Sequence, residues 1–203
     1  MKISKLHYIT ANPLHAEEAC KGGADWIQLR VKHRNDDDWK MIAEETKAIC
    51  KKYDAKLIIN DSVKLAKLVG ADGVHLGKDD MPPDEARKLL GPDFIIGGTA
   101  NTFEDIARLD ALRVDYIGLG PFRYTQTKAN LSPLLGLEGY LELMKACVVE
   151  HIKVPVIAIG GIKINDVEEI LATGVYGIAV SSAISNSGDV TATTHAFIHR
   201  MKK

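Results

Sequence analysis

Three polar side chains alternate with apolar ones in one short segment of the chain. Gln28, Arg30 and Lys32 would share one face of an extended strand, because successive strand side chains point to opposite sides. The guanidinium of Arg30 and the ammonium of Lys32 suit a phosphate or diphosphate group. We interpret this face as part of a pocket for a phosphorylated ligand, with a merely solvated strand end as the alternative.

Two aspartates follow two other apolar segments. Asp61 comes directly after Asn60, and Asp80 lies in the polar run that ends the next segment. Carboxylates beside a phosphate pocket suggest Mg²⁺, which is held by one or two carboxylates together with substrate oxygens. Each aspartate alone is also a common helix N-cap residue, so the spacing leaves both interpretations open.

Glycines and serines follow the last two apolar segments. Gly160 and Gly161 come after one of them, and Ser181 and Ser182 after the other. Glycine lets a backbone approach a phosphate closely, and serine adds a hydroxyl group. These residues predict a second phosphate site, with a pair of tight turns as the alternative.

Residues 123–136 form a long connection between apolar segments. Thr125, Thr127 and Lys128 within it offer two hydroxyls and a cation. Long connections of this kind often close over an active site, so we expect a lid, with an ordinary surface loop as the alternative. His75 lies inside an apolar segment, where a hydrogen-bonded core residue is more common than a base.

Apolar, β-branched segments alternate with helix-like segments along the chain. The expected strands are residues 6–10, 25–30, 56–60, 73–76, 94–99, 116–120, 155–160 and 177–182. The expected helices are residues 13–22, 36–52, 62–69, 83–90, 102–112, 137–149, 166–172 and 189–201.

This repeated alternation indicates parallel strands joined by crossover helices. Eight such units in 203 residues predict a single (β/α)8 TIM barrel of the α/β class, with a doubly wound open sheet as the alternative. The barrel is favoured because polar or glycine-rich residues follow nearly every strand. A barrel places its active site at the carboxyl ends of the strands, which would gather the candidate residues above.

The composition indicates one globular domain over residues 1–203. The chain is 46% hydrophobic and 26% charged, and its length fits one domain at roughly 150 residues per domain. Its net charge of −1 argues against a nucleic-acid partner. The sequence has no long apolar stretch, so we expect no membrane contact and a cytoplasmic location. The three cysteines are far apart and fit neither a zinc site nor a redox pair.

Taken in chain order, the motifs at the strand ends resemble those of the thiamine-phosphate synthase family. The motifs are Gln28-Leu29-Arg30-x-Lys32, Asn60-Asp61, His75-Leu76-Gly77-x-Asp79-Asp80, Gly120-Pro121-Phe122 with Thr125-x-Thr127-Lys128, Ile159-Gly160-Gly161-Ile162 and Ser182-Ala183-Ile184. Each motif is weak alone, but the ordered set is specific and spans residues 6–184. The resemblance implies a Mg²⁺-dependent transferase that joins 4-amino-2-methyl-5-pyrimidinylmethyl diphosphate to thiazole phosphate and releases diphosphate.

The resemblance also implies a role for each matching residue. Gln28 would contact the pyrimidine; Arg30, Lys32, Asn60 and Lys128 would hold the diphosphate and act in catalysis; Asp61 and Asp80 would bind Mg²⁺; Thr99 would lie near the diphosphate; and Thr125, Thr127, Gly161 and Ser182, with neighbouring Ser181, would hold the thiazole phosphate. The family mechanism is dissociative: diphosphate departs, and the thiazole nitrogen attacks a pyrimidine-stabilised cation. It needs no protein nucleophile, and the sequence shows no evident one.

Two of the departures from the family pattern bear on the site. Asn101 stands where the family usually has histidine, and Lys78 where it commonly has glutamine. Asparagine cannot exchange a proton, which puts any role of a histidine there in doubt. The charge of Lys78 next to Asp79 and Asp80 would either weaken metal binding or add a phosphate contact.

Two alternatives to the synthase remain at this point. One is the related thiazole tautomerase; Pro121 here replaces its proton-transferring histidine, and that paralogue tends to lose the aspartate at position 61. The other is a non-catalytic phosphate-binding barrel, which would not need Asp61, Asp80 and Lys128. The expected partners are two small-molecule substrates and no nucleic acid, and a homo-oligomer is left open.

Overall fold

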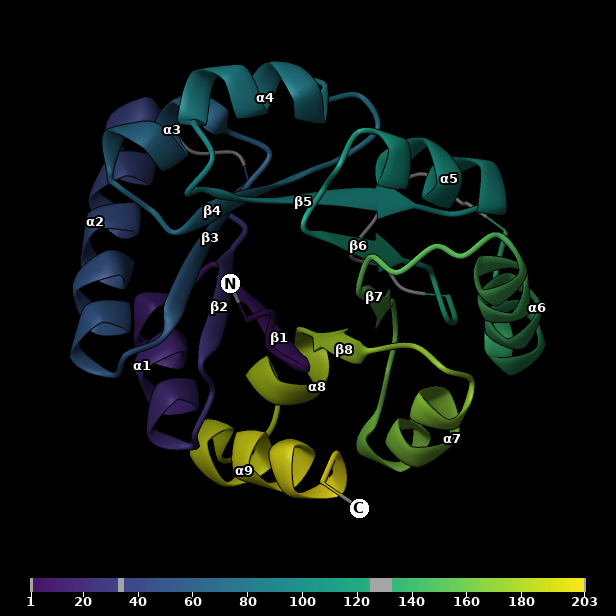
Figure 1. Cartoon of the computed structure of the whole chain (residues 1–203). Coiled ribbons are helices and arrows are strands. Elements are labelled where there is room, and N and C mark those ends of the chain that lie inside the picture. Colours follow the sequence, from purple (N-terminus) through teal and green to yellow (C-terminus); the bar gives the residue numbers. More distant parts are fainter. Residues whose placement is uncertain (1, 33–34, 125–132, 203) are drawn as a thin grey trace.

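Eight short parallel strands pair in chain order and close into a barrel (Figure 1). Their bounds are β1 Leu6–Thr10, β2 Trp26–Leu29, β3 Lys56–Asn60, β4 Gly73–Leu76, β5 Ile95–Ala100, β6 Tyr116–Leu119, β7 Val156–Ile159 and β8 Gly177–Val180. Tyr8 of β1 lies opposite Ile27 of β2 and opposite Val180 of β8, and this second pairing closes the ring. The structure is a computed structural model that describes residues 2–32, 35–124 and 133–202. The predicted TIM barrel is confirmed.

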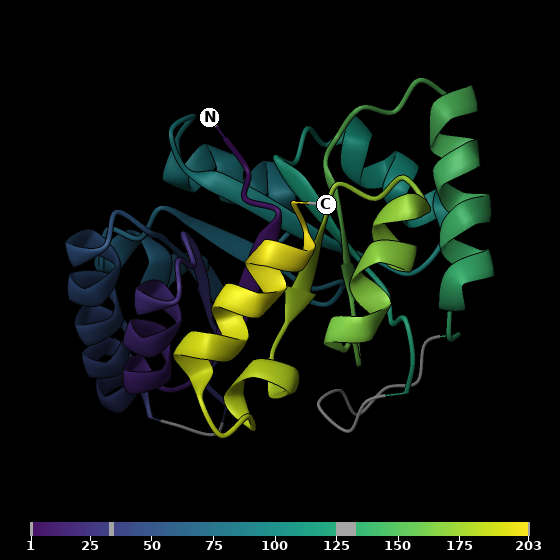
Figure 2. The same ribbon diagram turned by 90° about the horizontal axis from the view of Figure 1, so that it is seen from below.

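Helices surround the barrel on its outside (Figure 1). They are α1 Pro13–Lys21, α2 Asp36–Lys52, α3 Val63–Leu68, α4 Pro83–Leu90, α5 Phe103–Ala111, α6 Gly136–Val149, the 3-10 turn η1 Ile164–Asp166, α7 Val167–Ala172, α8 Ser182–Ser185 and α9 Val190–Arg200. Figure 2 shows α9 along the flank of the barrel and α8 at the end where the strands finish. The helix α8 is a difference from the sequence prediction, which extended the last strand to residue 182; β8 ends at Val180 and the chain turns there.

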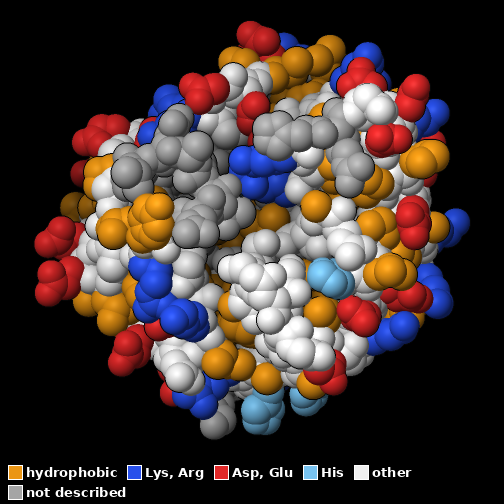
Figure 3. All heavy atoms as spheres, turned by 180° about the vertical axis from the view of Figure 1, so that it is seen from behind, with side chains coloured by type: hydrophobic (Ala, Val, Ile, Leu, Met, Phe, Trp, Pro, Cys, Tyr) orange, Lys and Arg blue, Asp and Glu red, His pale blue; other side chains and the backbone are white. Residues whose placement is uncertain are grey.

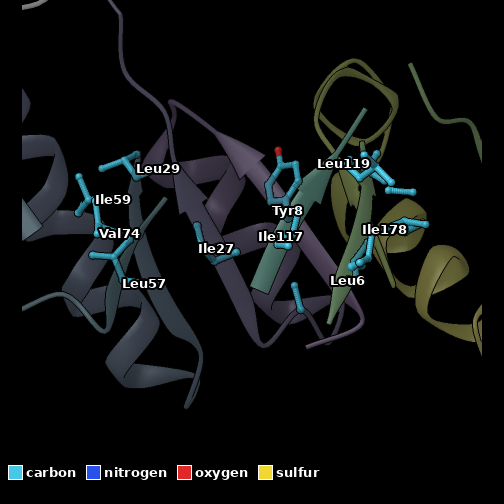
Figure 4. Packing of buried hydrophobic residues seen from close by; sticks show 14 of the residues in the cluster. Leu6, Tyr8, Ile27, Leu29, Leu57, Ile59, Val74, Ile117, Leu119 and Ile178 are labelled. Atoms are coloured by element: carbon cyan, nitrogen blue, oxygen red, sulfur yellow. The ribbon is translucent and has the colours of Figure 1, made fainter. Parts of the chain in front are cut away.

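Alternate strand residues point outward and pack against the helices. Figure 4 labels ten of these buried side chains, among them Ile27, Leu29, Leu57 and Ile59 from β2 and β3. Complete burial of one such side chain contributes about 1.5–3 kcal/mol relative to leaving it in water. This outer layer is the main core of the fold, and it fixes which strand residues must face the barrel interior.

Strand residues that point inward near the amino ends of the strands fill the barrel interior there. Trp26 and Tyr116 are essentially inaccessible to solvent, and the His7 ring stacks on Trp26 with centroids 4.2 Å apart. Burial, together with the nearby His75, lowers the pKa of His7 to about 3, so its imidazole is neutral at physiological pH. This end of the barrel is therefore filled by packed side chains, and open space is left at the carboxyl ends of the strands.

Local signals in the sequence account for most helix starts. Thr102 and Asp105 form a capping box at α5, in which each side chain accepts a hydrogen bond from the other's backbone N–H. Asn35 caps the first turn of α2, which carries three aspartates and suits the positive end of the helix dipole. None of the helices among the described residues is long and apolar enough to cross a membrane.

Candidate active site

A cavity of about 500 Å³ opens at the carboxyl ends of the strands. Figure 3 looks onto this end and shows a hollow with lysine or arginine atoms in its wall, bordered by uncharged side chains. The cavity is lined by the expected site residues Gln28, Arg30, Asn60, Thr99, Gly161, Ser181 and Ser182, and also by Asn101. Residues that lie far apart in the sequence are thus brought together at one mouth.

A buried amide pair forms the floor of the cavity on the β2–β3 side. Gln28 Nε2 donates to Asn60 Oδ1 at 2.7 Å, and both side chains are buried. Arg30 follows β2 and lines the cavity above this pair, whereas Lys32 is exposed and lies outside the lining. Gln28 and Arg30 thus lie on one side of the cavity, whereas Lys32, three residues past the end of β2 at Leu29, does not line it.

The carboxyl groups of Asp61 and Asp80 lie within hydrogen-bonding reach of each other beside the cavity. Desolvation by the surrounding protein, and then the neighbouring Asp80, raise the pKa of Asp61 to about 6, whereas Arg30 and Asn60 act in the opposite direction. Asp80 lines a smaller pocket of about 70 Å³, and Thr99 lines both this pocket and the main cavity. Two carboxyl groups held so close suit a hard cation.

Neither aspartate acts as a helix cap. Ser62 caps α3, because its Oγ accepts from Leu65 N at 3.1 Å. Asp80 Oδ2 instead accepts from Gly77 N at 2.6 Å, and α4 begins after Pro82 without a side-chain cap. The helix-cap interpretation of the two aspartates is therefore wrong.

The protein side chains alone do not supply a complete set of metal ligands. Within the described ranges, no three His, Cys, Asp or Glu side chains come together as metal ligands. Asp61 and Asp80 supply two carboxylates, so the remaining positions around Mg²⁺ would be filled by water and substrate oxygens. The donor set therefore fits a cation that binds together with a phosphorylated substrate.

A hydrogen-bonded chain links side chains of the neighbouring strands β4, β5 and β6 at the cavity wall. His75 Nδ1 lies 3.0 Å from Tyr116 Oη, and His75 Nε2 lies 3.0 Å from Thr99 Oγ1. Burial strongly raises the pKa of Tyr116, so its hydroxyl stays protonated. The predicted core role of His75 fits this position, and the chain fixes the Thr99 hydroxyl at the cavity wall.

The asparagine that departs from the family pattern has a structural partner. Asn101 Nδ2 donates to the Gly120 carbonyl, and the Asn101 backbone N–H donates to Asp105 Oδ2 at 2.9 Å. A Cβ on Gly120 would lie 2.2 Å from the Ile159 carbonyl oxygen, so β6 and β7 approach closely there. Asn101 therefore ties the end of β5 to the end of β6.

The second candidate phosphate site is built from strained turns that only glycine fits well. Gly160 and Gly161 have φ of +104° and +69°, in the region that favours glycine. Both line the cavity, opposite Arg30, together with Ser181 and Ser182 from the β8–α8 connection. These turns bring backbone and hydroxyl groups to the cavity wall.

Three predicted site residues, Thr125, Thr127 and Lys128, lie outside the described residues. The described ends of this connection are joined to one another. Leu135 N donates to the Pro121 carbonyl and Gly136 N to the Phe122 carbonyl, both at 3.0 Å.

Among the cavity residues that the sequence analysis missed, four stand out. Asn12 and His15 follow β1, and Tyr124 and Leu134 lie on either side of the undescribed segment. Asn12 and His15 could have been predicted from the sequence, because the end of the first strand faces the same mouth as the other strand ends. Tyr124 and Leu134 are exposed apolar residues in a connection, and no periodicity marks such positions.

Comparisons with known proteins agree with this geometry. The family described as "Thiamine monophosphate synthase" matches residues 6–184. Proteins named thiamine-phosphate synthase are similar to this chain: one from Flavobacterium johnsoniae is 49% identical, covering 92% of this chain and 88% of that protein, and one from Bacteroides fragilis is 50% identical, covering 91% and 90%. A solved structure described as thiamine phosphate pyrophosphorylase from Pyrococcus furiosus is 33% identical with a TM-score of 0.87, covering 98% of this chain and 95% of that one. The chain therefore belongs to the thiamine monophosphate synthase family.

Proposed function

We propose that the chain joins a pyrimidinylmethyl diphosphate to a thiazole phosphate, giving thiamine phosphate and diphosphate. One observation carries the proposal: a single cavity has anion-binding groups on two opposite walls. Arg30 and Asn60 line it near β2 and β3, and Gly161 and Ser182 line it near β7 and β8. Because β3 and β7 face each other across an eight-stranded ring, the two walls could each hold one phosphorylated group.

The wall near β2–β4 suits the diphosphate leaving group. Its negative charge grows as the bond to the pyrimidinylmethyl carbon breaks, and the fixed donors of Arg30 would stabilise that charge. Asp61 and Asp80 would hold Mg²⁺, which supplies further positive charge to the diphosphate when bound. Lys32 and Lys128 are the further cations that the family resemblance assigns to this group.

The other residues of the cavity would bind and orient the two rings. Gln28, fixed by Asn60 at 2.7 Å, would present its amide to the pyrimidine. Gly161, Ser181 and Ser182, with Thr125 and Thr127, would hold the thiazole phosphate so that the ring nitrogen faces the reacting carbon. The nitrogen lone pair forms the new C–N bond and the diphosphate leaves with the electron pair of the broken C–O bond, so no protein nucleophile is required.

The family membership supports the synthase over both alternatives. Proteins named thiamine-phosphate synthase align over about nine-tenths of the chain, which favours the synthase over the tautomerase and over a non-catalytic phosphate-binding barrel. We further propose that the two small phosphorylated molecules are the ligands of this site and that the reaction takes place in the cytoplasm.

The proposed reaction is tested by incubating the purified protein with both substrates and Mg²⁺. Thiamine phosphate is quantified by oxidation to a fluorescent thiochrome, and a parallel sample contains EDTA. We expect product with Mg²⁺ and little with EDTA. A folded protein that yields no product would overturn the proposal, and equal product with EDTA would overturn the metal assignment.

A further inference from the structure

The chain that leaves β6 lies directly against the turn that follows β7. Phe122 N donates to the Ile159 carbonyl at 2.8 Å, and Arg123 N donates to the Gly160 carbonyl at 3.1 Å. These bonds continue the β6–β7 contact beyond the ends of both strands. The backbone of residues 122–123 therefore forms one side of the glycine turn.

The Arg123 side chain then contacts the same turn a second time. Its Nη1 donates to the Gly161 carbonyl at 3.0 Å and to Asp166 Oδ2 at 2.6 Å, and its Nη2 donates to Asp166 Oδ1 at 2.8 Å. Asp166 also accepts from Lys163 N at 2.7 Å. One guanidinium thus joins the glycine turn to η1.

The paired charges support this arrangement. Although burial acts in the opposite direction, hydrogen bonds from Arg123 and the Lys163 backbone hold the pKa of Asp166 below its ordinary value. The turn is also shaped around the arginine, because a Cβ on Gly161 would lie 2.5 Å from Arg123 Cγ.

Two peptide groups of the turn are oriented by these contacts. In a trans peptide the C=O and the following N–H point in opposite directions within one plane. Arg123 holds the carbonyls of Gly160 and Gly161, so the N–H groups of Gly161 and Ile162 point away from Arg123. Gly160, Gly161 and Ile162 all line the cavity.

We propose that Arg123 and Asp166 form a positioning pair for the second phosphate site, setting the orientation of the Gly161 and Ile162 N–H groups that receive the thiazole phosphate. The identity of this ligand rests on the function proposed above. Arg123 acts through the turn because its donors are already directed at Asp166 and Gly161. Losing the pair should therefore weaken the binding of one substrate and spare the other.

The chain offers a matched control at the other end of the barrel. Arg87 Nη2 lies 2.6 Å from Asp115 Oδ2, and Asp115 immediately precedes β6, far from the carboxyl ends of the strands. Arg87→Met removes a pair of the same kind without touching the cavity lining. It separates a general loss of stability from an effect on the phosphate site.

The experiment compares Arg123→Met, Arg123→Lys, Asp166→Asn and Arg87→Met. The KM for each substrate and kcat are measured by steady-state kinetics, and binding of thiazole phosphate is measured by calorimetry. We expect Arg123→Met and Asp166→Asn to raise both the KM and the Kd for thiazole phosphate about tenfold, a change of about 1.4 kcal/mol. The KM for the pyrimidine diphosphate should stay within about twofold, Arg123→Lys should be intermediate, and Arg87→Met should change neither constant.

Three outcomes would overturn the positioning role. These are an unchanged KM for thiazole phosphate, an equal rise in both KM values, or loss of folding in Asp166→Asn and Arg123→Lys as judged by circular dichroism. The calorimetric measurement needs no turnover. If the wild type binds thiazole phosphate but makes no product, the proposed reaction is wrong. The positioning role is then still tested by whether the variants weaken the calorimetric binding of thiazole phosphate.

Discussion

Lys78 Nζ lies 2.5 Å from Asp105 Oδ2 and connects the chain after β4 to the first turn of α5. Asp105 also accepts from the backbone N–H groups of Asn101 and Thr102. Although burial acts in the opposite direction, hydrogen bonds from Lys78 and from these backbone N–H groups hold the pKa of Asp105 below its ordinary value. The positive charge of Lys78 is thus paired with Asp105, so it does not compete for the aspartates of the proposed metal site.

Replacing Lys78 with the family's common glutamine should leave catalysis nearly unchanged. In Lys78→Gln, Asp105 keeps its backbone donors, and a half-exposed ion pair contributes only about 0–1 kcal/mol. We expect the Mg²⁺ concentration for half-maximal rate to stay within about twofold in initial-rate assays. A tenfold change would show that Lys78 acts on the metal or the diphosphate after all.

Asp61→Asn should abolish activity while stabilising the metal-free protein. Asp61 has φ of +68°, and asparagine tolerates this left-handed conformation, whereas alanine adds backbone strain. At pH 7.5 Asp61 is ionised in surroundings that disfavour its charge, so removing that charge should raise the free energy of unfolding by about 1 kcal/mol, after allowing for solvent screening. Thermal denaturation should show Tm higher by about 2–4 °C, with turnover lowered at least about a hundredfold.

Asp79→Asn is the control for this variant. Asp79 is exposed and adjoins Asp80, so the substitution changes net charge equally beside the same site. We expect nearly normal turnover and Tm. Equal losses of activity in both variants would mean that net charge, and not the Asp61–Asp80 pair, supports the reaction.

Mg²⁺ binding should release protons near pH 6 and almost none at pH 8. The folded pKa of Asp61 is raised to about 6, and the cation binds the ionised form. The same shift fixes the sign for stability: without metal, the folded state holds the proton more tightly, so the free energy of unfolding falls as pH rises from about 4 to about 6. Calorimetry in buffers of different ionisation enthalpy measures the release, and a pH-independent proton count would contradict the prediction.

The sequence was sufficient to predict the barrel and most of the mouth. Strand segments such as residues 56–60 and 73–76 are bounded by polar or glycine residues, and the alternation that places Gln28 and Arg30 on one face is a local property. Helix starts such as Thr102 with Asp105 are equally local. Local patterns of this kind need no tertiary information.

Contacts between segments far apart in the sequence could not be predicted from such local patterns. Arg123 and Asp166 are 43 positions apart, and nothing in either neighbourhood indicates the other. The short helix α8 was missed because four residues carry no periodicity, and Lys32 was assigned to the cavity face because the alternation of Gln28 and Arg30 was extended past the end of the strand. Such features depend on where strands end and how neighbouring turns pack.

Gly161→Ala should damage both stability and the proposed thiazole phosphate site. A left-handed alanine costs about 1–2 kcal/mol, and the new Cβ would also displace Arg123, whose Cγ would be 2.5 Å away. The free energy of unfolding, measured with urea, should therefore fall by more than this strain alone, and the KM for thiazole phosphate should rise at least about tenfold. Gly70→Ala isolates the strain, because Gly70 has φ of +61° and no atom within 4 Å of an added Cβ. If both variants lose equal stability and keep the wild-type KM, the close packing of Arg123 on the glycine turn has no part in binding.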